Sequence, residues 1–175
     1  MDLVVQDNKM YIPIACKTHF SLLRSLTKSA SLIDKCLKNN INCIGIADYK
    51  TLSGCIEFYK KCISKNIKPL LGINLGEVAL IAKNLNGWKQ LIKIVTDLNI
   101  KKENYLIESS DLICVCGIIG SNIHKIIKGQ QKGWITEVLS NYDYFCSLFK
   151  RDNVYLGCSN IKSLNAGLRK INIEY

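Results

Sequence analysis

The sequence predicts an α/β fold in which parallel strands alternate with helices that cover them. Short apolar runs bounded by turn-forming residues recur along the chain, which is typical of strands buried on both faces. Between these runs lie segments whose apolar residues repeat with the spacing of an amphipathic helix. Local pattern leaves two architectures open, a doubly wound open sheet and a βα barrel.

The N-terminal part of the chain predicts two strands and one helix. Residues 11–16 form a short apolar run typical of a buried strand, and a loop rich in Thr and Ser follows. Residues 31–34 have the spacing of a helix-capping box, and the asparagines at 39–40 would end that helix. Residues 42–47 are continuously apolar, which favours a second strand buried on both faces.

The middle of the chain continues the alternation. An amphipathic helix is predicted over 52–63. Its expected apolar face comprises Leu52, Cys55, Ile56, Tyr59, Cys62 and Ile63. Residues 67–75 and 77–82 are predicted strands, and either Asn84 or Asn86 would cap the next helix, whose apolar face runs from Trp88 to Leu98.

The last third predicts a strand over 111–116, a helix and a final strand over 154–158. The helix is marked by the apolar stripe Val138, Leu139, Tyr142, Phe145, Cys146 and Phe149. A chain of 175 residues is long enough to bury a core without disulfides or metal. Because no repeat, low-complexity tract or linker interrupts it, we expect residues 1–175 to form a single domain.

The chain is basic, with 24 Lys and Arg residues against 14 Asp and Glu residues and a formal charge of +10. A basic surface attracts nucleic acid or anionic membrane. However, the lysines are scattered and no run of five like charges occurs, which favours the codon bias of an A/T-rich genome. Charge by itself therefore does not establish a DNA partner.

Nine cysteines and an N-terminus without the features of a signal peptide predict a soluble, cytoplasmic protein with free thiols. The longest apolar run, 112–120, is too short to span a membrane. The loop at 17–24 contains no glycine, which argues against dinucleotide and P-loop sites. With only His19 and His124 in the chain, a metal site built mainly from histidine is excluded.

Five stretches of the sequence, in order and at comparable spacing, resemble the N-terminal PHP domain of the bacterial replicative DNA polymerase III alpha subunit. They are residues 17–23, 45–60, 67–72, 80–95 and 111–120. The resemblance covers about 11–158. It implies a distorted, TIM-like parallel βα barrel of PHP type, which this short chain would leave incomplete. It also implies that active relatives hold metal with histidines and carboxylates at the strand ends.

Most of the ligand positions implied by the resemblance are changed in this sequence. Residues 15–17, Ala-Cys-Lys, replace a His-x-His pair, and His19 replaces an acidic residue. Tyr49 replaces a histidine and Asn74 a frequent glutamate, so that only Asp48 matches. We therefore expect at most a vestigial metal site at Asp48 and His19, which Cys16 or Cys43 could join, and no catalytic residues. No cofactor is expected; if a metal is bound, it would be Mn, Zn or Mg.

The resulting prediction is a PHP domain related to the polymerase III alpha subunit that serves DNA replication as a catalytically degenerate structural or docking module. This chain alone is not expected to be an enzyme. One alternative is a metal-dependent phosphoesterase or 3'-5' exonuclease with a reduced metal site, and a second is a nonspecific basic DNA-binding domain. The expected partners are replicative polymerase components, including the proofreading exonuclease subunit. DNA and a second copy joined through exposed sheet edges are further candidates, and a membrane is not.

Other pairs of polar residues carry less weight. Asp48 and Glu57 could be an acid and base, but Glu57 falls on the polar face of its helix and is expected to be solvated. Ser21 and His19 lie too close in sequence to form a nucleophile and base, and no acidic third member is evident. His124 lies between apolar helical positions and is expected to point outward.

Overall fold

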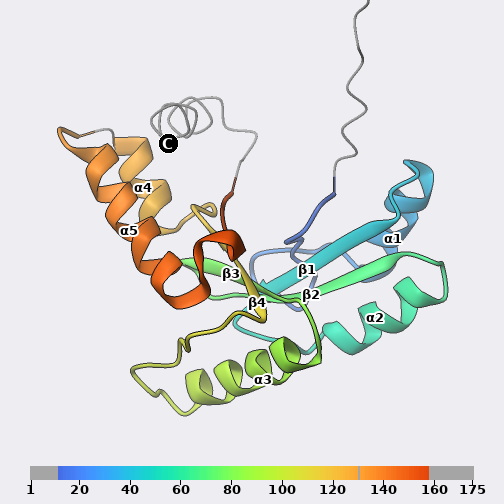
Figure 1. The fold of residues 1–175 in the computed structure, drawn as a ribbon. Helices are drawn as coiled ribbons and strands as arrows, with labels where there is room; N and C mark the ends of the chain where they lie inside the picture. The colour runs from blue at the N-terminus through green and yellow to red at the C-terminus, as the bar shows by residue number, and fades with distance from the viewer. Residues whose placement is uncertain (1–11, 130, 158–175) are drawn as a thin grey trace, which may run out of the picture.

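The computed structural model describes residues 12–129 and 131–157, in which five strands form one mixed sheet with helices packed against it (Figure 1). In chain order the elements are α1 (Ser29–Lys38), β1 (Cys43–Tyr49), α2 (Cys55–Ile63), β2 (Lys68–Asn74), β3 (Val78–Ala82), α3 (Leu85–Asn99), β4 (Leu112–Cys116), α4 (Asn122–Gly129), α5 (Trp134–Phe149), the 3-10 helix η1 (Arg151–Asn153) and β5 (Val154–Leu156). The α/β class and most of the expected elements are confirmed.

The sheet is mixed, which corrects the prediction of parallel strands throughout. Its strand order is β1-β2-β3-β4-β5, with β1 parallel to β2 and β4 parallel to β5. The pairs β2-β3 and β3-β4 are antiparallel. The turn between β2 and β3 contains only residues 75–77, with Gly76 at φ 96°, and a parallel crossover needs a dozen or more residues. The short connection therefore reverses the chain direction.

The expected first strand, 11–16, is reduced to one bridge between Cys16 and Ile46, and Tyr11 lies outside the described residues. The Gly45 N–H donates to the Pro13 carbonyl at 2.7 Å, and the Cys16 N–H donates to the Gly45 carbonyl at 3.0 Å. In a regular parallel ladder, a single residue lies between the two residues that bond to the N–H and to the carbonyl of the same partner. Here two residues, Ile14 and Ala15, lie between Pro13 and Cys16. This extra residue is a bulge, and it explains why the segment follows β1 without forming a regular strand.

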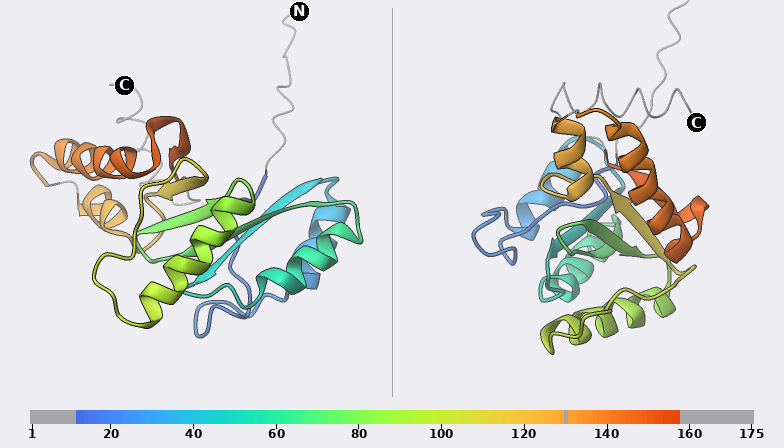
Figure 2. Two further views of the ribbon diagram at one scale, coloured as in Figure 1. Left: turned by 60° about the horizontal axis from the view of Figure 1, so that its bottom comes forward. Right: turned by 90° about the vertical axis from the view of Figure 1, so that its left-hand side faces the viewer.

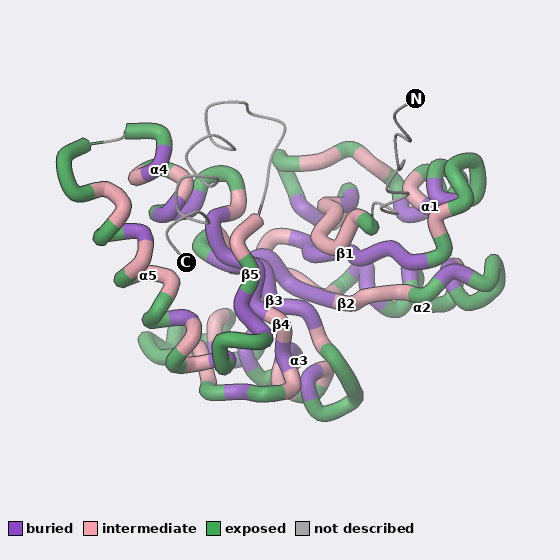
Figure 3. The backbone as a smooth tube through the Cα atoms, turned by 45° about the horizontal axis from the view of Figure 1, so that its top comes forward, coloured by how far each residue is buried: buried purple, intermediate pink, exposed green. Residues whose placement is uncertain are grey.

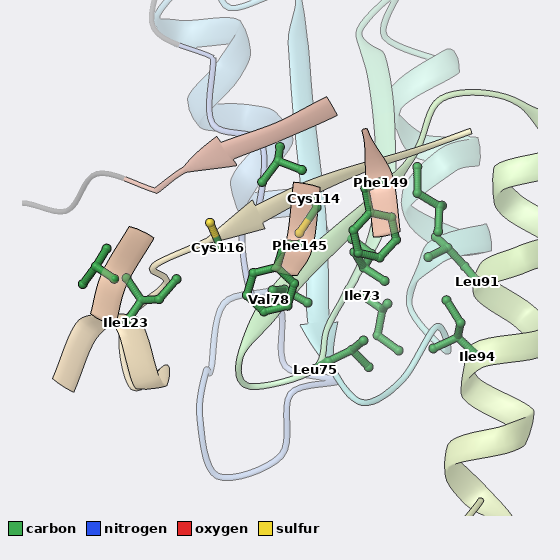
Figure 4. Packing of buried hydrophobic residues seen from close by; sticks show 14 of the residues in the cluster. Ile73, Leu75, Val78, Leu91, Ile94, Cys114, Cys116, Ile123, Phe145 and Phe149 are labelled. Carbon is green, nitrogen blue, oxygen red and sulfur yellow. The ribbon is translucent and has the colours of Figure 1, made fainter. Parts of the chain in front are cut away.

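The α-helices of the described residues pack against side chains on one face of the sheet. Figure 2 shows α1 and α2 at the β1 end of the sheet and α4 and α5 at the other end. β1 contributes Ile44 and Ile46, which pack with α1 and α2. The larger cluster joins β2, β3 and β4 to α3, α4 and α5, and Figure 4 shows Phe145 and Phe149 of α5 directed at it. The opposite face carries a smaller cluster of Ala47, Ala79, Ile81 and Val115. Figure 3 shows the resulting burial along the strands.

Several element ends and faces differ from the predictions. α1 begins at Ser29 with no side-chain cap, so the expected capping box at 31–34 is not used. In α2, Ile56, Tyr59 and Ile63 are exposed, because the sheet covers the face made by Cys55, Phe58 and Cys62. Half of the predicted apolar face of this helix was therefore wrong.

Other details agree with the sequence. Asn84, and not Asn86, caps α3, because its side chain accepts a hydrogen bond from the Gly87 N–H. The apolar stripe of α5 is buried or half-buried as expected. β5 ends at Leu156, and Cys158, the expected end of this strand, lies outside the described residues.

In the described ranges the sheet is open, with β1 and β5 at its two edges. The segment before α1 runs along the outer edge of β1 through its bridge at Cys16. None of the helices in the described ranges is both long enough and apolar enough to cross a membrane.

Candidate functional site

The candidate site lies at the carboxyl end of β1. Asp48 lies two and four residues after Ile46 and Ile44, so these three side chains point to the same face of the sheet. This is the face that the helices cover. Asp48 is 1% exposed. The loop of residues 17–28, between the bulged segment and α1, closes over its carboxylate.

Three donors from this loop satisfy the Asp48 carboxylate. Oδ1 accepts from the Thr18 N–H at 2.7 Å and from the Ser21 hydroxyl at 2.6 Å, and Oδ2 accepts from the Thr18 hydroxyl at 2.6 Å. The Ser21 oxygen in turn accepts from the Tyr49 N–H at 2.9 Å. Hydrogen bonds of this length to a carboxylate are among the stronger ones in proteins. We call Asp48, Thr18 and Ser21 the Asp48 latch.

Gly54, just before α2, allows the loop to approach this closely. A Cβ atom at Gly54 would lie 2.6 Å from the Phe20 ring and 3.3 Å from Asp48 Oδ2. A side chain there would push Phe20 and the loop away from the strand end. The latch therefore depends on a residue without a side chain on the neighbouring connection.

His19, the other predicted ligand, lies on the exposed side of the loop. Its ring contacts Phe20 with 4.4 Å between the ring centroids, and its backbone N–H donates to the Thr27 carbonyl at 2.9 Å. None of the donors to Asp48 in the described part of the chain belongs to His19. A metal ion shared by Asp48 and His19 would have to bind the Asp48 carboxylate oxygens. The Thr18 and Ser21 hydroxyls already donate to these oxygens.

The residues at this strand end do not fit a divalent metal. Two of the three donors to Asp48 are hydroxyl groups whose protons already point at its oxygens. Cys16 is half-buried, and burial, with a smaller effect from the nearby Cys36 thiol, raises the pKa of Cys16 to about 11. Cys43 lies five residues back along β1, about 16 Å away and on the other face. In the described ranges no group of three or more His, Cys, Asp or Glu side chains is arranged to hold a metal.

Two other candidates from the sequence, Glu57 and His124, have local structural roles. Glu57 is exposed, as expected, and pairs with Lys61 while accepting from the Ser29 hydroxyl. These two hydrogen bonds hold the pKa of the Glu57 carboxyl below its ordinary value. His124 is half-buried, and its Nδ1 accepts from the Gly120 N–H at 2.8 Å.

Sequence reasoning missed the residues that define this site. Thr18 was not singled out, and Ser21 was weighed only as a nucleophile, although both hydroxyls serve Asp48. Arg24 was also missed: its guanidinium lies 3.6 Å from the centre of the Tyr49 ring. The sequence did contain a signal for this site. Thr18 and Ser21 form a Thr-x-x-Ser pair in a loop, and Asp48 stands near the end of the next buried strand.

Buried thiols give the protein a testable pH dependence. Burial raises the pKa of Cys55 to about 12, with a smaller effect from the Asp48 charge, and burial likewise raises the pKa of Cys116 to about 12. An unfolded thiol titrates at about 8.5. Above that pH the unfolded chain releases protons that the folded chain keeps, so stability is complete below pH 8.5 and is lost as the pH rises toward 12.

We expect urea unfolding to show a loss of about 1 kcal/mol per buried thiol between pH 7.5 and 9.5. The variant Cys55→Ala should have a smaller loss over the same interval, whatever its stability at pH 7.5. An identical pH slope for the wild type and this variant would contradict the assignment of the effect to Cys55.

Comparisons with known proteins agree on one family. The family model described as PHP domain matches residues 14–160. The DNA polymerase III alpha subunit of Ureaplasma parvum is 33% identical over 112 residues, which is 61% of this chain and 12% of that protein. The corresponding subunit of Buchnera aphidicola is 26% identical over 190 residues, covering 90% of this chain and 16% of that protein.

More distant similarities follow the same pattern. The alpha subunit of Haemophilus influenzae is 23% identical over 168 residues, covering 85% of this chain and 14% of that protein. The chain thus spans between 12% and 16% of the length of these three relatives. A crystal structure of a candidate metal-dependent phosphoesterase from Bifidobacterium adolescentis has a TM-score of 0.38 and 18% identity, over 52% of this chain and 35% of that one.

Proposed function

This chain belongs to the PHP domain family, with homology to the PHP regions of DNA polymerase III alpha subunits, and from that premise we propose that it is a catalytically degenerate structural or docking module of DNA replication. The observation that carries the proposal is the Asp48 latch. The one residue that matches the family's metal-ligand pattern is buried and bonded to two hydroxyl groups and a backbone N–H. Asp48 here holds a loop in place.

The partners belong to the same proposal. Homology to the alpha subunit points to a replicative polymerase context, and within it we propose polymerase components, including the proofreading exonuclease subunit, as binding partners. A second copy could pair through the open edges of the sheet, and DNA is the alternative ligand that the charge of +10 favours. The eight described cysteines are free, which supports a cytoplasmic location.

The architecture proposed for the complete domain is a PHP-type barrel of which the described sheet is a part. All five helices lie on one face, as on the outside of a βα barrel. The other face carries a smaller apolar cluster that includes Ala47 and Ala79 and packs against Ile14 and Ala15, which supports a narrow interior on that side. The barrel would need further strands between β5 and β1 to close.

Metal analysis combined with a nuclease assay tests the proposed function. We expect the purified chain to contain less than stoichiometric Mn, Zn and Fe, to show no change in melting temperature on adding Mn²⁺ or Zn²⁺, and to leave single-stranded and duplex DNA intact. The reason is that no set of ligands at the strand end is free to bind an ion.

His19→Ala is the control variant, because His19 is exposed and its loss should not disturb the fold. Stoichiometric metal together with hydrolysis of DNA that is lost in His19→Ala would refute the degenerate assignment. That result would favour the phosphoesterase or exonuclease alternative.

A further inference from the structure

The loop of residues 17–28 displays the three most exposed large apolar side chains in the described ranges. Leu22, Leu23 and Leu26 are 81%, 107% and 96% exposed, and no other large apolar side chain there exceeds 69%. These leucines lie within five residues of one another. Clustered exposed apolar side chains mark interaction sites more often than single ones do.

The loop is held in one conformation. Two of its residues, Thr18 and Ser21, are fixed by the Asp48 latch, and the Arg24 N–H donates to the Ser21 carbonyl at 3.0 Å. Leu23 has φ 58°, a left-handed conformation that residues with a side chain adopt uncommonly. A loop fixed in this way loses little conformational entropy when it binds a partner.

The loop that carries the leucines is positively charged. The loop contains Lys17, Arg24 and Lys28, and Lys50 lies next to Tyr49, whose ring Arg24 covers. Residues 12–33 contain no Asp or Glu. The acidic group beneath, Asp48, is buried and fully bonded, and therefore offers no carboxylate to a ligand at the surface.

We propose that this loop is a docking surface for an acidic amphipathic helix of a partner protein. The leucines would pack against the apolar face of the helix, while the loop cations pair with its carboxylates. Arg24 suits this role because its planar guanidinium is already positioned by Tyr49 and can bind a carboxylate through two donors. This inference rests on the proposed function in one respect, which is that the protein acts by docking to a partner.

Other occupants fit this surface less well. Single-stranded nucleic acid binds by stacking bases on aromatic rings, but Arg24 covers the Tyr49 ring and Phe20 packs against Gly54. Leucine side chains offer no such stacking surface. A second copy would bring two loops of the same positive charge together, which repel each other.

Fluorescence anisotropy with a labelled synthetic helix tests the proposal. The probe carries leucine along one face and glutamate along the other, and a matched peptide has lysine in place of glutamate. We expect the wild-type chain to bind the glutamate peptide and not the lysine peptide. The variants Leu22→Ser with Leu26→Ser, and Arg24→Glu, should each weaken binding at least about tenfold.

Leu85→Ser and Lys93→Glu on α3 are the matched controls, because they remove an exposed leucine and an exposed cation away from the loop. Both should bind the glutamate peptide as the wild type does, and all variants should keep the wild-type melting temperature. Peptide binding that is absent, or equal in the loop variants and the controls, would overturn the proposal.

The same variants separate this inference from its competitors. Tighter binding of an oligonucleotide, or of vesicles containing phosphatidylserine, that is lost in Arg24→Glu would assign the loop to DNA or membrane and overturn the proposal. None of these results changes the metal and nuclease measurements, so the docking surface and the degenerate assignment fail independently.

Discussion

Replacing Asp48 with Ala is expected to lower the free energy of unfolding by about 3–5 kcal/mol. The substitution removes a carboxylate that is 1% exposed and leaves the Thr18 N–H and the Thr18 and Ser21 hydroxyls buried without their acceptor. Each donor that loses its partner away from water costs free energy. Urea denaturation followed by circular dichroism at constant pH measures the change.

The same variant should loosen the loop. Amide hydrogen exchange at Thr18 should accelerate strongly, because its N–H donates directly to Asp48 Oδ1. Asp34→Ala is the control, since Asp34 is exposed on α1 and its loss should change stability by less than about 0.5 kcal/mol. If added Mn²⁺ stabilised the wild type and not an Asp48→Asn variant, Asp48 would be a metal ligand and the latch interpretation would be wrong.

Replacing Gly45 with Ala is expected to cost about 3 kcal/mol and to displace the segment before the loop. A Cβ atom at Gly45 would lie 2.1 Å from the Ile14 carbonyl oxygen and 2.6 Å from the Ile14 carbonyl carbon. Both are backbone atoms, so a rotamer change cannot relieve the clash. The hydrogen bonds that join Gly45 to Pro13 and Cys16 would be strained or lost.

Thermal and urea unfolding of Gly45→Ala test this expectation. Gly129→Ala is the matched control, because no atom of the described residues outside its own helix and chain neighbours lies within 4 Å of its added Cβ, and alanine favours the helical conformation at the end of α4. We expect its stability to be unchanged or slightly raised. Equal stability of the two variants would show that the bulged segment is not packed against β1 as described.

Much of the architecture could be predicted from local pattern. The run 42–47 became β1, and the apolar stripe around Phe145 became the buried face of α5, because burial on these elements follows directly from residue spacing. Strand direction could not be predicted in the same way. It depends on connection length, and the three residues between β2 and β3 are too few for a parallel crossover, so these two strands are antiparallel.

The face of α2 shows why periodicity has a limit. Ile56, Tyr59 and Ile63 share the helical spacing of buried residues, yet they are exposed. Two overlapping apolar stripes were present on this helix, and only the position of the sheet decides which one is covered. Spacing reports a candidate face, whereas packing selects it.

For the candidate site, the sequence predicted an incomplete set of metal ligands, because most residue types at the positions implied by the PHP resemblance are changed. It also placed Asp48 at a strand end. The hydrogen-bond partners of Asp48 could be identified only in the folded chain, because they lie 27 and 30 residues away in sequence. Hydrogen bonds over such separations depend on how the loop folds back over β1, which no local pattern encodes.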